Sequence, residues 1–162
     1  MPDHSPTLHM LCAAGKSTLA ASLASAPETV LIAEDDWLNA LFADELVSLP
    51  DYVRCSSKLR RIMGPHVAAM LNAGVSIVLD FPANTVEQRR WMRGILEKTT
   101  ASHLLHLLDV PEEICLARLR DRNSQGDHPF AVTEAQFHQF SSYFAAPSAG
   151  EGWNIVKHEN GV

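Results

Sequence analysis

Short apolar runs alternate with longer amphipathic stretches along this chain. The apolar runs are rich in Val, Ile and Leu, which is typical of buried strands, and in the stretches between them apolar positions recur with helical spacing. We expect strands over Thr7–Cys12, Thr29–Ala33, Val75–Asp80, His103–Leu108 and Trp153–Val156. Strands that alternate with helices indicate an α/β fold whose parallel sheet is covered on both faces.

The first helices have clear boundaries. One is expected over Ser17–Ser25, and a long one begins near Pro50 and ends at Gly74. Proline lacks the amide hydrogen that a helix interior needs, and its ring clashes with the preceding turn. Gly64-Pro65 should therefore kink or break the long helix.

Capping motifs mark the later helices. Thr85-Val86-Glu87-Gln88 has the form of a capping box and opens a helix to about Thr99. Pro111 suits the first turn of a further helix. Thr133-Glu134-Ala135-Gln136 opens another helix, after a loop-like stretch over Asn123–Val132.

Length and charge restrict the protein class. The 162 residues suggest a single domain over 1–162 with one substantial core. A net charge of −6 argues against a broad nucleic-acid-binding surface, which is usually basic. Arg89, Arg90 and Arg93 cluster, and either a local basic groove or a solvated helix face would explain them.

Cysteine usage and the termini indicate the compartment. Cys12, Cys55 and Cys115 lack metal-ligand spacing, and their odd number does not suit a disulfide framework, so we expect buried reduced thiols. No apolar run reaches the ~18–20 residues that span a bilayer. Residues 1–6 lack the basic and apolar regions of a signal peptide. We therefore expect a cytoplasmic protein without a membrane anchor.

The strongest functional motif is Gly15-Lys16-Ser17-Thr18, between the first expected strand and the first helix. Gly-Lys-Ser/Thr in this position is the second half of a phosphate-binding P-loop. The Lys16 ammonium would meet the β- and γ-phosphates of a nucleotide, and the Ser17 hydroxyl would ligate Mg²⁺. Together with Ala14, Gly15 and Thr18 at the start of the helix, these residues are the expected nucleotide site.

The motif is incomplete at its start. The full pattern needs a glycine five positions before Gly15, where this chain has Met10. Only Ala13 and Ala14 separate the expected strand from Gly15, which is short for a loop that wraps a triphosphate. Either this is a true deletion, or about three loop residues are missing from the sequence. We favour the second interpretation, because the rest of the chain suits nucleotide chemistry.

Carboxylates follow the expected strands. In parallel sheets ligands bind beyond the carboxyl ends of the strands, so Asp35, Asp36 and Asp80 are candidates for one site with the P-loop. Asp35 would accept a proton from a substrate hydroxyl, whereas helix capping better explains Asp36. Asp80 would hold metal-bound water or the substrate, with a turn residue as the alternative. Val110-Pro111 favours a structural cap for Asp109.

Two arginines share one face of a later helix. Arg118 and Arg122 are four residues apart and precede a loop, so they could reach a triphosphate and neutralise the charge that develops during transfer. A solvated basic helix paired with nearby carboxylates is the alternative explanation.

Histidines and aromatic residues carry weaker signals. His103 and His106 are three apart on a strand and point to opposite faces, and His128 and His138 lie ten apart, so none forms a credible metal set. Structural or surface roles explain them better. Trp37, Trp91 and Phe81 would line a substrate pocket or pack in the core.

Four segments resemble the small P-loop kinases, a group that includes chloramphenicol phosphotransferase, zeta toxins, gluconate kinase and the AAA-33 kinase-like proteins. The resemblance rests on Gly15-Lys16-Ser17-Thr18, Ile32-Ala33-Glu34-Asp35-Asp36-Trp37, Val78-Leu79-Asp80 and Arg118-Leu119-Arg120-Asp121-Arg122. It implies a three-layer P-loop NTPase fold with a five-stranded sheet in the order 2-3-1-4-5 and a helical lid. It also implies that ATP and Mg²⁺ are the cofactors.

The resemblance also implies residue roles. Asp35 matches the usual base for the acceptor hydroxyl, and Arg118 and Arg122 match the lid. Polynucleotide kinases carry an arginine at the position of Leu38, so this leucine and the acidic charge weaken a nucleic-acid substrate. We therefore expect an ATP-dependent kinase that phosphorylates a hydroxyl of a small molecule, with much of the acceptor pocket in Leu38–Gly74. The alternative is a nucleotide-binding regulatory module or slow NTPase without a phosphoryl acceptor.

Overall fold

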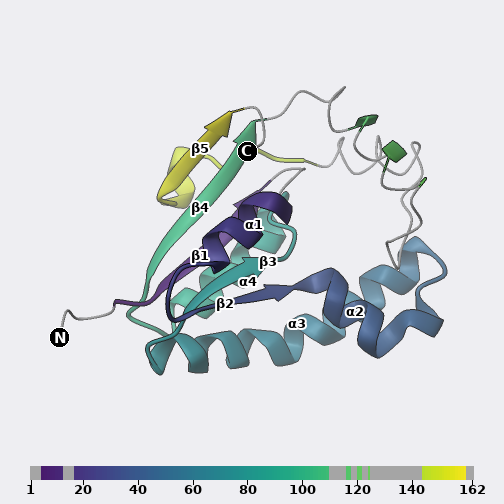
Figure 1. The fold of residues 1–162 in the computed structure, drawn as a ribbon, viewed down its shortest axis with the longest axis horizontal. Helices are drawn as coiled ribbons and strands as arrows, with labels where there is room; N and C mark the ends of the chain where they lie inside the picture. Colours follow the sequence, from purple (N-terminus) through teal and green to yellow (C-terminus); the bar gives the residue numbers. More distant parts are fainter. Residues whose placement is uncertain are drawn as a thin grey trace.

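Five parallel strands form the central sheet, in the order β2-β3-β1-β4-β5. The computed structural model of the chain describes residues 5–12, 17–109, 116–117, 120–121, 124 and 144–159. The strands are β1 (Thr7–Cys12), β2 (Thr29–Ala33), β3 (Ser76–Asp80), β4 (Ser102–Asp109) and β5 (Ile155–Glu159), shown in Figure 1. The expected sheet order is confirmed.

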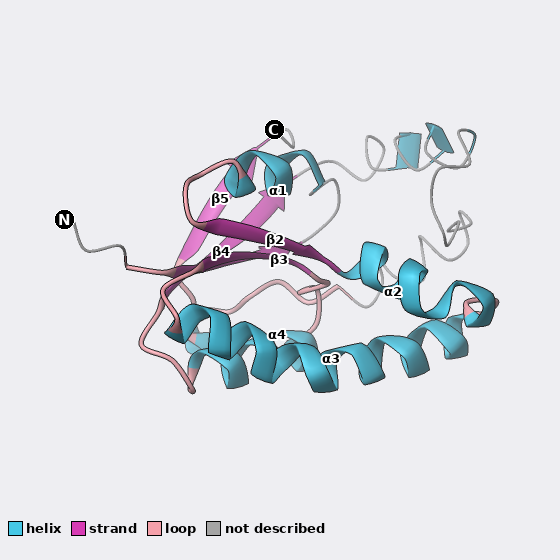
Figure 2. Cartoon of the chain, turned by 60° about the horizontal axis from the view of Figure 1, so that its bottom comes forward, coloured by secondary structure: helices cyan, strands magenta, loops and turns pink. Residues whose placement is uncertain are grey.

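Helices cover both faces of the sheet. The helix α1 (Ser17–Ala24) lies on one face, and α3 (Leu49–Asn72) and α4 (Val86–Leu96) lie on the other (Figure 2). Directly after β2 comes α2 (Glu34–Phe42), which packs on α3. Two short 3-10 helices complete the described elements, η1 (Ala43–Glu45) and η2 (Ala149–Glu151).

The core is divided by the sheet. The larger part joins the strands to α3 and α4 through buried aliphatic, Met and Phe side chains; it includes Leu8, Met10, Leu59, Met63, Val67, Leu79, Phe81, Met92 and Leu105. The smaller part joins the opposite face to α1 through Leu11, Leu19, Ala20, Val78 and Leu108. Burial of these apolar surfaces is the main driving force that fixes the helices on the sheet.

The long helix does not break where the sequence predicts. It continues as α-helix from Leu49 to Asn72 through Pro65. Pro65 lies on the exposed side of α3, so the carbonyl that loses its helical partner can bond to water instead. Gly64 faces inward, where a Cβ atom would lie 3.3 Å from Trp91 Nε1, so the missing side chain lets α3 approach α4.

Four strands differ from their expected environment or bounds. The strand β3 begins one residue later than expected, at Ser76, and β4 is one residue longer at each end, Ser102–Asp109. The sequence of β2 is typical of a buried strand, but β2 is an edge strand in which Val30 and Leu31 are 43% and 38% exposed. The last strand begins at Ile155 rather than at Trp153. The expected elements at Pro111 and Thr133-Glu134-Ala135-Gln136 lie outside the described residues.

The arginines of α4 hold the C-terminal segment. Together with Glu151 and Trp153 they line a small cavity, which agrees with the local groove expected from the sequence, whereas the buried Arg89 does not fit a solvated helix face. Arg89 is only 1% exposed; its Nε donates to Glu151 Oε1 at 2.8 Å and its Nη1 donates to the Ala83 carbonyl at 2.9 Å. Arg93 lies over the Trp153 ring at 3.9 Å and donates to the Glu151 carbonyl. The hydrogen bond from Arg89, above all, lowers the pKa of Glu151 to about 2. This cluster, which we call the Arg89–Glu151 clamp, fastens η2 and β5 to α4.

Three histidines form a ladder across β1, β4 and β5. The Nδ1 atom of His9 lies 3.0 Å from Nε2 of His106, and the Nδ1 atom of His106 lies 2.9 Å from Nε2 of His158. Burial above all, and then the charges of the two neighbours, lowers the pKa of His106 to about 4. His103 points the other way and contacts Trp153. His128 and His138 lie outside the described residues.

Two smaller sequence predictions concern the thiols and membrane spans. Cys12 and Cys55 are buried free thiols, as expected, and Cys115 lies outside the described residues. Within the described part of the chain, no helix combines the length and apolar character that crossing a bilayer requires.

Candidate active site

Three strand ends meet at one edge of the sheet and bring the predicted functional residues together. The strands β2, β3 and β1 are neighbours, and the register places Ala33 beside Asp80 and Leu79 beside Met10. At this edge β2 leads straight into α2, as Figures 1 and 2 show. Parallel sheets bind ligands outside such carboxyl ends. Asp35, Asp80 and the start of α1 therefore belong to one region.

Only part of the predicted site falls in the described structure. Ser17 and Thr18 are exposed in the first turn of α1, Asp35 is exposed in α2, and Asp80 is half-buried at the end of β3. The remaining predicted site residues lie outside the described residues; they are Ala14, Gly15, Lys16, Arg118 and Arg122. The helical lid also remains a prediction.

The first turn of α2 is acidic, but Asp36 is not its cap. The N-cap residue is Ala33, which makes no side-chain capping bond, and Glu34, Asp35 and Asp36 are the first three helical residues. The capping role predicted for Asp36 is therefore wrong, because the helix begins directly at the strand end, three residues earlier. Carboxylates in a first turn favour the helix by facing the positive end of its dipole.

Glu34 is the buried member of this acidic turn. It is 3% exposed, and Tyr52 Oη donates to its Oε1 at 2.5 Å. Burial, and then the charge of Glu34, raises the pKa of Tyr52 well above its ordinary value; the nearby charges of Arg60 and Asp35 act on the same phenol. Tyr52 therefore connects the carboxylates of α2 to α3.

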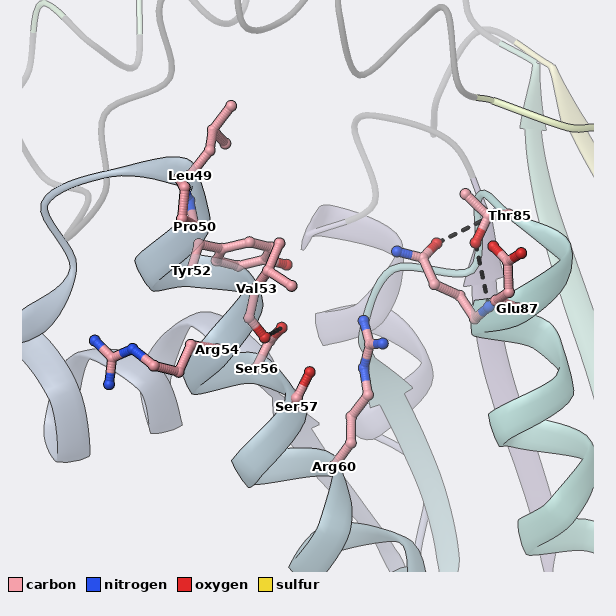
Figure 3. A pocket seen from close by; sticks show the side chains of 11 residues that line it. Leu49, Pro50, Tyr52, Val53, Arg54, Ser56, Ser57, Arg60, Thr85 and Glu87 are labelled. Atoms are coloured by element: carbon pink, nitrogen blue, oxygen red, sulfur yellow. Dashed lines mark hydrogen bonds between the residues drawn. The ribbon is translucent and has the colours of Figure 1, made fainter.

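A cavity of about 720 Å³ opens beside Tyr52 (Figure 3). The first turns of α3 form one wall, and the start of α4 forms the other. Its lining comprises Leu49, Pro50, Tyr52, Val53, Arg54, Ser56, Ser57, Arg60, Thr85, Glu87 and Gln88. Most of these residues belong to the segment expected to form the acceptor pocket, while Thr85, Glu87 and Gln88 come from outside it.

The capping box predicted at Thr85 is confirmed and stiffens the wall at α4. Thr85 Oγ1 accepts a hydrogen bond from the backbone N–H of Gln88 at 3.2 Å. The side-chain oxygen of Gln88, Oε1, accepts from the backbone N–H groups of Thr85 and Asn84 at 3.1 and 2.8 Å. Because its oxygen is engaged twice, Gln88 presents its amide nitrogen, a hydrogen-bond donor, to the cavity.

The two arginines of the cavity differ in their partners. Arg54 is paired with Glu45 at 3.0 Å and Asp51 at 3.3 Å. Arg60 has its Cζ atom 5.7 Å from the centre of the Trp91 ring, and its Nε is buried without a hydrogen-bond partner among the described residues. In Figure 3 its guanidinium lies on the cavity side of α3, across from Thr85 and Glu87.

None of the three aromatic residues considered for a pocket, Trp37, Trp91 and Phe81, lines this cavity. Phe81 is fully buried in the core, and its ring lies 5.4 Å from that of Trp91. Trp91 contacts Arg60, which lines the cavity, through its ring. Trp37 is 40% exposed on α2.

Ser17 in the first turn of α1 and Asp80 at the end of β3 have side chains of the kind that a magnesium ion prefers. Ser17 and Asp80 offer only oxygen donors, which Mg²⁺ prefers, and Mg²⁺ usually takes one or two protein ligands together with phosphates and water. The described residues contain no group of three or more His, Cys, Asp or Glu side chains that could hold a metal ion by itself.

The fold and the strand-end site define a protein with the small P-loop kinase fold. The profile of the AAA_33 family, an AAA domain, matches residues 8–147, and the chain belongs to this family. Among curated proteins, none matches the sequence.

Solved structures with this fold support the same class. A putative kinase from Chloroflexus aurantiacus has a TM-score of 0.74 and 18% identity, over 98% of this chain and 87% of that one. Kti12 from Chaetomium thermophilum with ADP-AlF3 has a TM-score of 0.71 and 12% identity, over 96% and 89%. The APS kinase CysC of Mycobacterium tuberculosis, in complex with AMPPNP and APS, has a TM-score of 0.61 and 14% identity, over 98% and 90%.

Proposed function

We propose that this protein is an ATP-dependent kinase that transfers the γ-phosphate of ATP to a hydroxyl group of a small molecule. The observation that carries the proposal is the cavity of about 720 Å³ beside the acidic turn of α2. Its volume falls within the roughly 300–1,000 Å³ of small-molecule sites. Tyr52 lines the cavity and donates to Glu34, the residue before Asp35, so an acceptor bound there would have the acidic turn of α2 nearby.

The proposed residue roles follow the chemistry of phosphoryl transfer. Lys16 and the start of α1 hold the β- and γ-phosphates, and Asp35 accepts the proton of the attacking hydroxyl. The hydroxyl oxygen bonds to the γ-phosphorus while the bond to the leaving ADP oxygen breaks. Arg118 and Arg122 stabilise the charge on the transferring group. Mg²⁺, held by Ser17 and Asp80, would supply further charge neutralisation when bound.

The fold relatives support this class of reaction. One of them is an APS kinase in complex with AMPPNP and APS, and another is a sugar kinase from Janibacter. The net charge of −6 and Leu38 favour a small molecule over a nucleic acid as acceptor.

The test is transfer of γ-labelled phosphate from Mg-ATP into a small-molecule extract. Wild type is compared with Asp35→Asn, with Asp36→Asn as the matched control from the same exposed helical turn. Loss of a general base is expected to slow transfer by about 10²–10⁴-fold, and the control should retain transfer. Equal transfer by wild type and Asp35→Asn would remove Asp35 as the base, and wild-type transfer by Lys16→Ala would overturn the kinase assignment.

A nucleotide-binding module without an acceptor is the second candidate. Met10, which takes the place of the first P-loop glycine, is a fully buried residue of β1 paired with Leu79. Only four residues then join Cys12 to Ser17. Intact mass shows whether the loop is this short in the protein; a matching mass, with nucleotide binding but neither ADP nor labelled product, would favour this function.

A further inference from the structure

Arg60 is the arginine of the cavity that has no charged partner among the described residues. Arg54 forms salt bridges with two exposed or half-exposed carboxylates, those of Glu45 and Asp51. Arg60 has no salt bridge and no hydrogen bond within the parts of the chain that the structure describes, and its buried Nε therefore lacks an acceptor. A buried donor of a charged group is normally satisfied, so this guanidinium is built for a partner that is not part of the described chain.

Packing holds Arg60 in place. Its guanidinium lies against the Trp91 ring, and Trp91 in turn lies against the buried Phe81. A cation–π contact of this kind restrains the guanidinium, and its planar fork of donors therefore loses little freedom on binding. Such a fork matches the two oxygens of a carboxylate, phosphate or sulfate.

The surroundings of Arg60 also favour an anion. Gln88 offers an amide donor from the opposite wall, and Ser57 is an exposed hydroxyl of the same cavity. The carboxylate of Glu34 is engaged by Tyr52, while that of Glu87 is exposed at the start of α4. Two neutral donors, Gln88 and Ser57, thus share the cavity with Arg60, and Glu87, across from Arg60 in Figure 3, is the carboxylate that lines it.

We infer that the acceptor carries an oxyanion, namely a carboxylate, phosphate or sulfate, and that Arg60 binds this group from the floor of the cavity. The inference rests on the proposed function, because it names the class of acceptor for that site. The acceptor would span the cavity, with its anionic end at Arg60 and its hydroxyl toward Asp35. Arg60 and Tyr52 line the same cavity, and Tyr52 donates to Glu34, the residue before Asp35, so one small molecule can reach toward both ends.

Binding at Arg60 can be measured without catalysis through the Trp91 indole N–H signal, followed by NMR and assigned with Trp91→Phe. The titration uses the Lys16→Ala variant, which removes the expected phosphate-binding lysine, and compares glycerol 3-phosphate with glycerol. Glycerol 3-phosphate is expected to shift the Trp91 signal, and glycerol is not. Arg60→Met should weaken binding about tenfold to hundredfold, because a hydrogen bond to a charged group is lost.

Two further variants make the result specific. Arg61→Met removes an exposed arginine that does not line the cavity and should bind like its parent. Arg60→Lys keeps the charge but loses the fork, so intermediate binding is expected. A dispersed Trp91 signal in each variant shows that it is folded. Equal affinity of Arg60→Met and its parent would overturn the inference, as would equal shifts by glycerol and its phosphate.

Labelled transfer separates this inference from the kinase itself. If wild type transfers phosphate to neutral acceptors and Arg60→Met does so equally well, the kinase stands and the anionic acceptor is overturned. If no transfer occurs but Arg60-dependent anion binding is found, the anion site stands and the proposed reaction fails. Loss of transfer to an anionic acceptor in Arg60→Met, with retention in Arg61→Met, supports both.

Discussion

The contact between Glu34 and Tyr52 is the clearest single-residue feature of the site. A carboxylate that is 3% exposed depends on its hydrogen-bond donors, because a buried charge without them is costly. Tyr52→Phe removes one donor and little volume. We expect it to lower the free energy of unfolding by about 1.5–3 kcal/mol, the usual range for a hydrogen bond to a charged group.

A double-mutant cycle tests this prediction. Glu34→Gln removes the charge, and after that change Tyr52→Phe should cost less than it does in wild type. Urea denaturation of the four proteins gives the coupling free energy. Additive losses would show that the hydrogen bond does not stabilise the folded state.

At the scale of elements, α3 carries two poor helix formers in one turn, Gly64 and Pro65, whose replacement should stabilise the protein to different extents. Pro65 is exposed, so Pro65→Ala restores an amide and removes a clash; we expect the free energy of unfolding to rise by about 1–3 kcal/mol. For Gly64→Ala, the free energy of unfolding should rise by less than the roughly 1 kcal/mol by which alanine exceeds glycine in helix propensity. The reason is that its Cβ would lie 3.3 Å from Trp91 Nε1.

Urea denaturation of both variants measures the difference. Lower stability of Pro65→Ala would contradict the prediction, as would a larger gain for Gly64→Ala than for Pro65→Ala.

Elements were predictable where their signals are local. The ranges of β1 and β2, the capping box at Thr85 and the sheet order, which came from the resemblance, all hold. Of the kink or break expected at Gly64-Pro65, the break does not occur, because propensity ignores that one side of α3 faces water. Likewise, the apolar sequence of β2 does not reveal that it lies at the edge.

The site was predictable only where a motif lies beside a strand end. Asp35 and Asp80 could be named in this way. Glu34, Tyr52 and Arg60 could not, because their roles depend on α3 packing against α2 and α4, which places residues far apart in sequence around one cavity. No local pattern in the sequence shows that Glu34, the residue before Asp35, is buried.

At the scale of the whole molecule, two clusters should make stability fall in acid, over different pH windows. The pKa of His106 is about 4 in the folded protein and 6.5 ordinarily, so the unfolded chain takes up a proton first. Stability is then lost as pH falls from about 6.5 to 4. The pKa of Glu151 is about 2 instead of 4.5, so its contribution is present above 4.5 and lost as pH falls toward 2.

Urea denaturation between pH 8 and pH 3 separates the two clusters, each variant serving as the control for the other. His106→Gln should flatten the dependence between about pH 6.5 and 4, and Glu151→Gln should flatten only the part below about 4.5. A wild-type profile that is flat from pH 7 to pH 4 would contradict the role of the histidine ladder.

The Arg89–Glu151 clamp has a consequence for the order of synthesis. Arg89 leaves the ribosome 62 residues before its partner. At about 5–20 residues per second this delay lasts roughly 3–12 seconds. During that time α4 cannot pack on the sheet with Arg89 paired to Glu151, so part of the apolar surface of the nascent chain stays exposed. The pairing of α4 is therefore completed only when η2 has been synthesised, and a nascent chain arrested before Glu151 should be a substrate for chaperones.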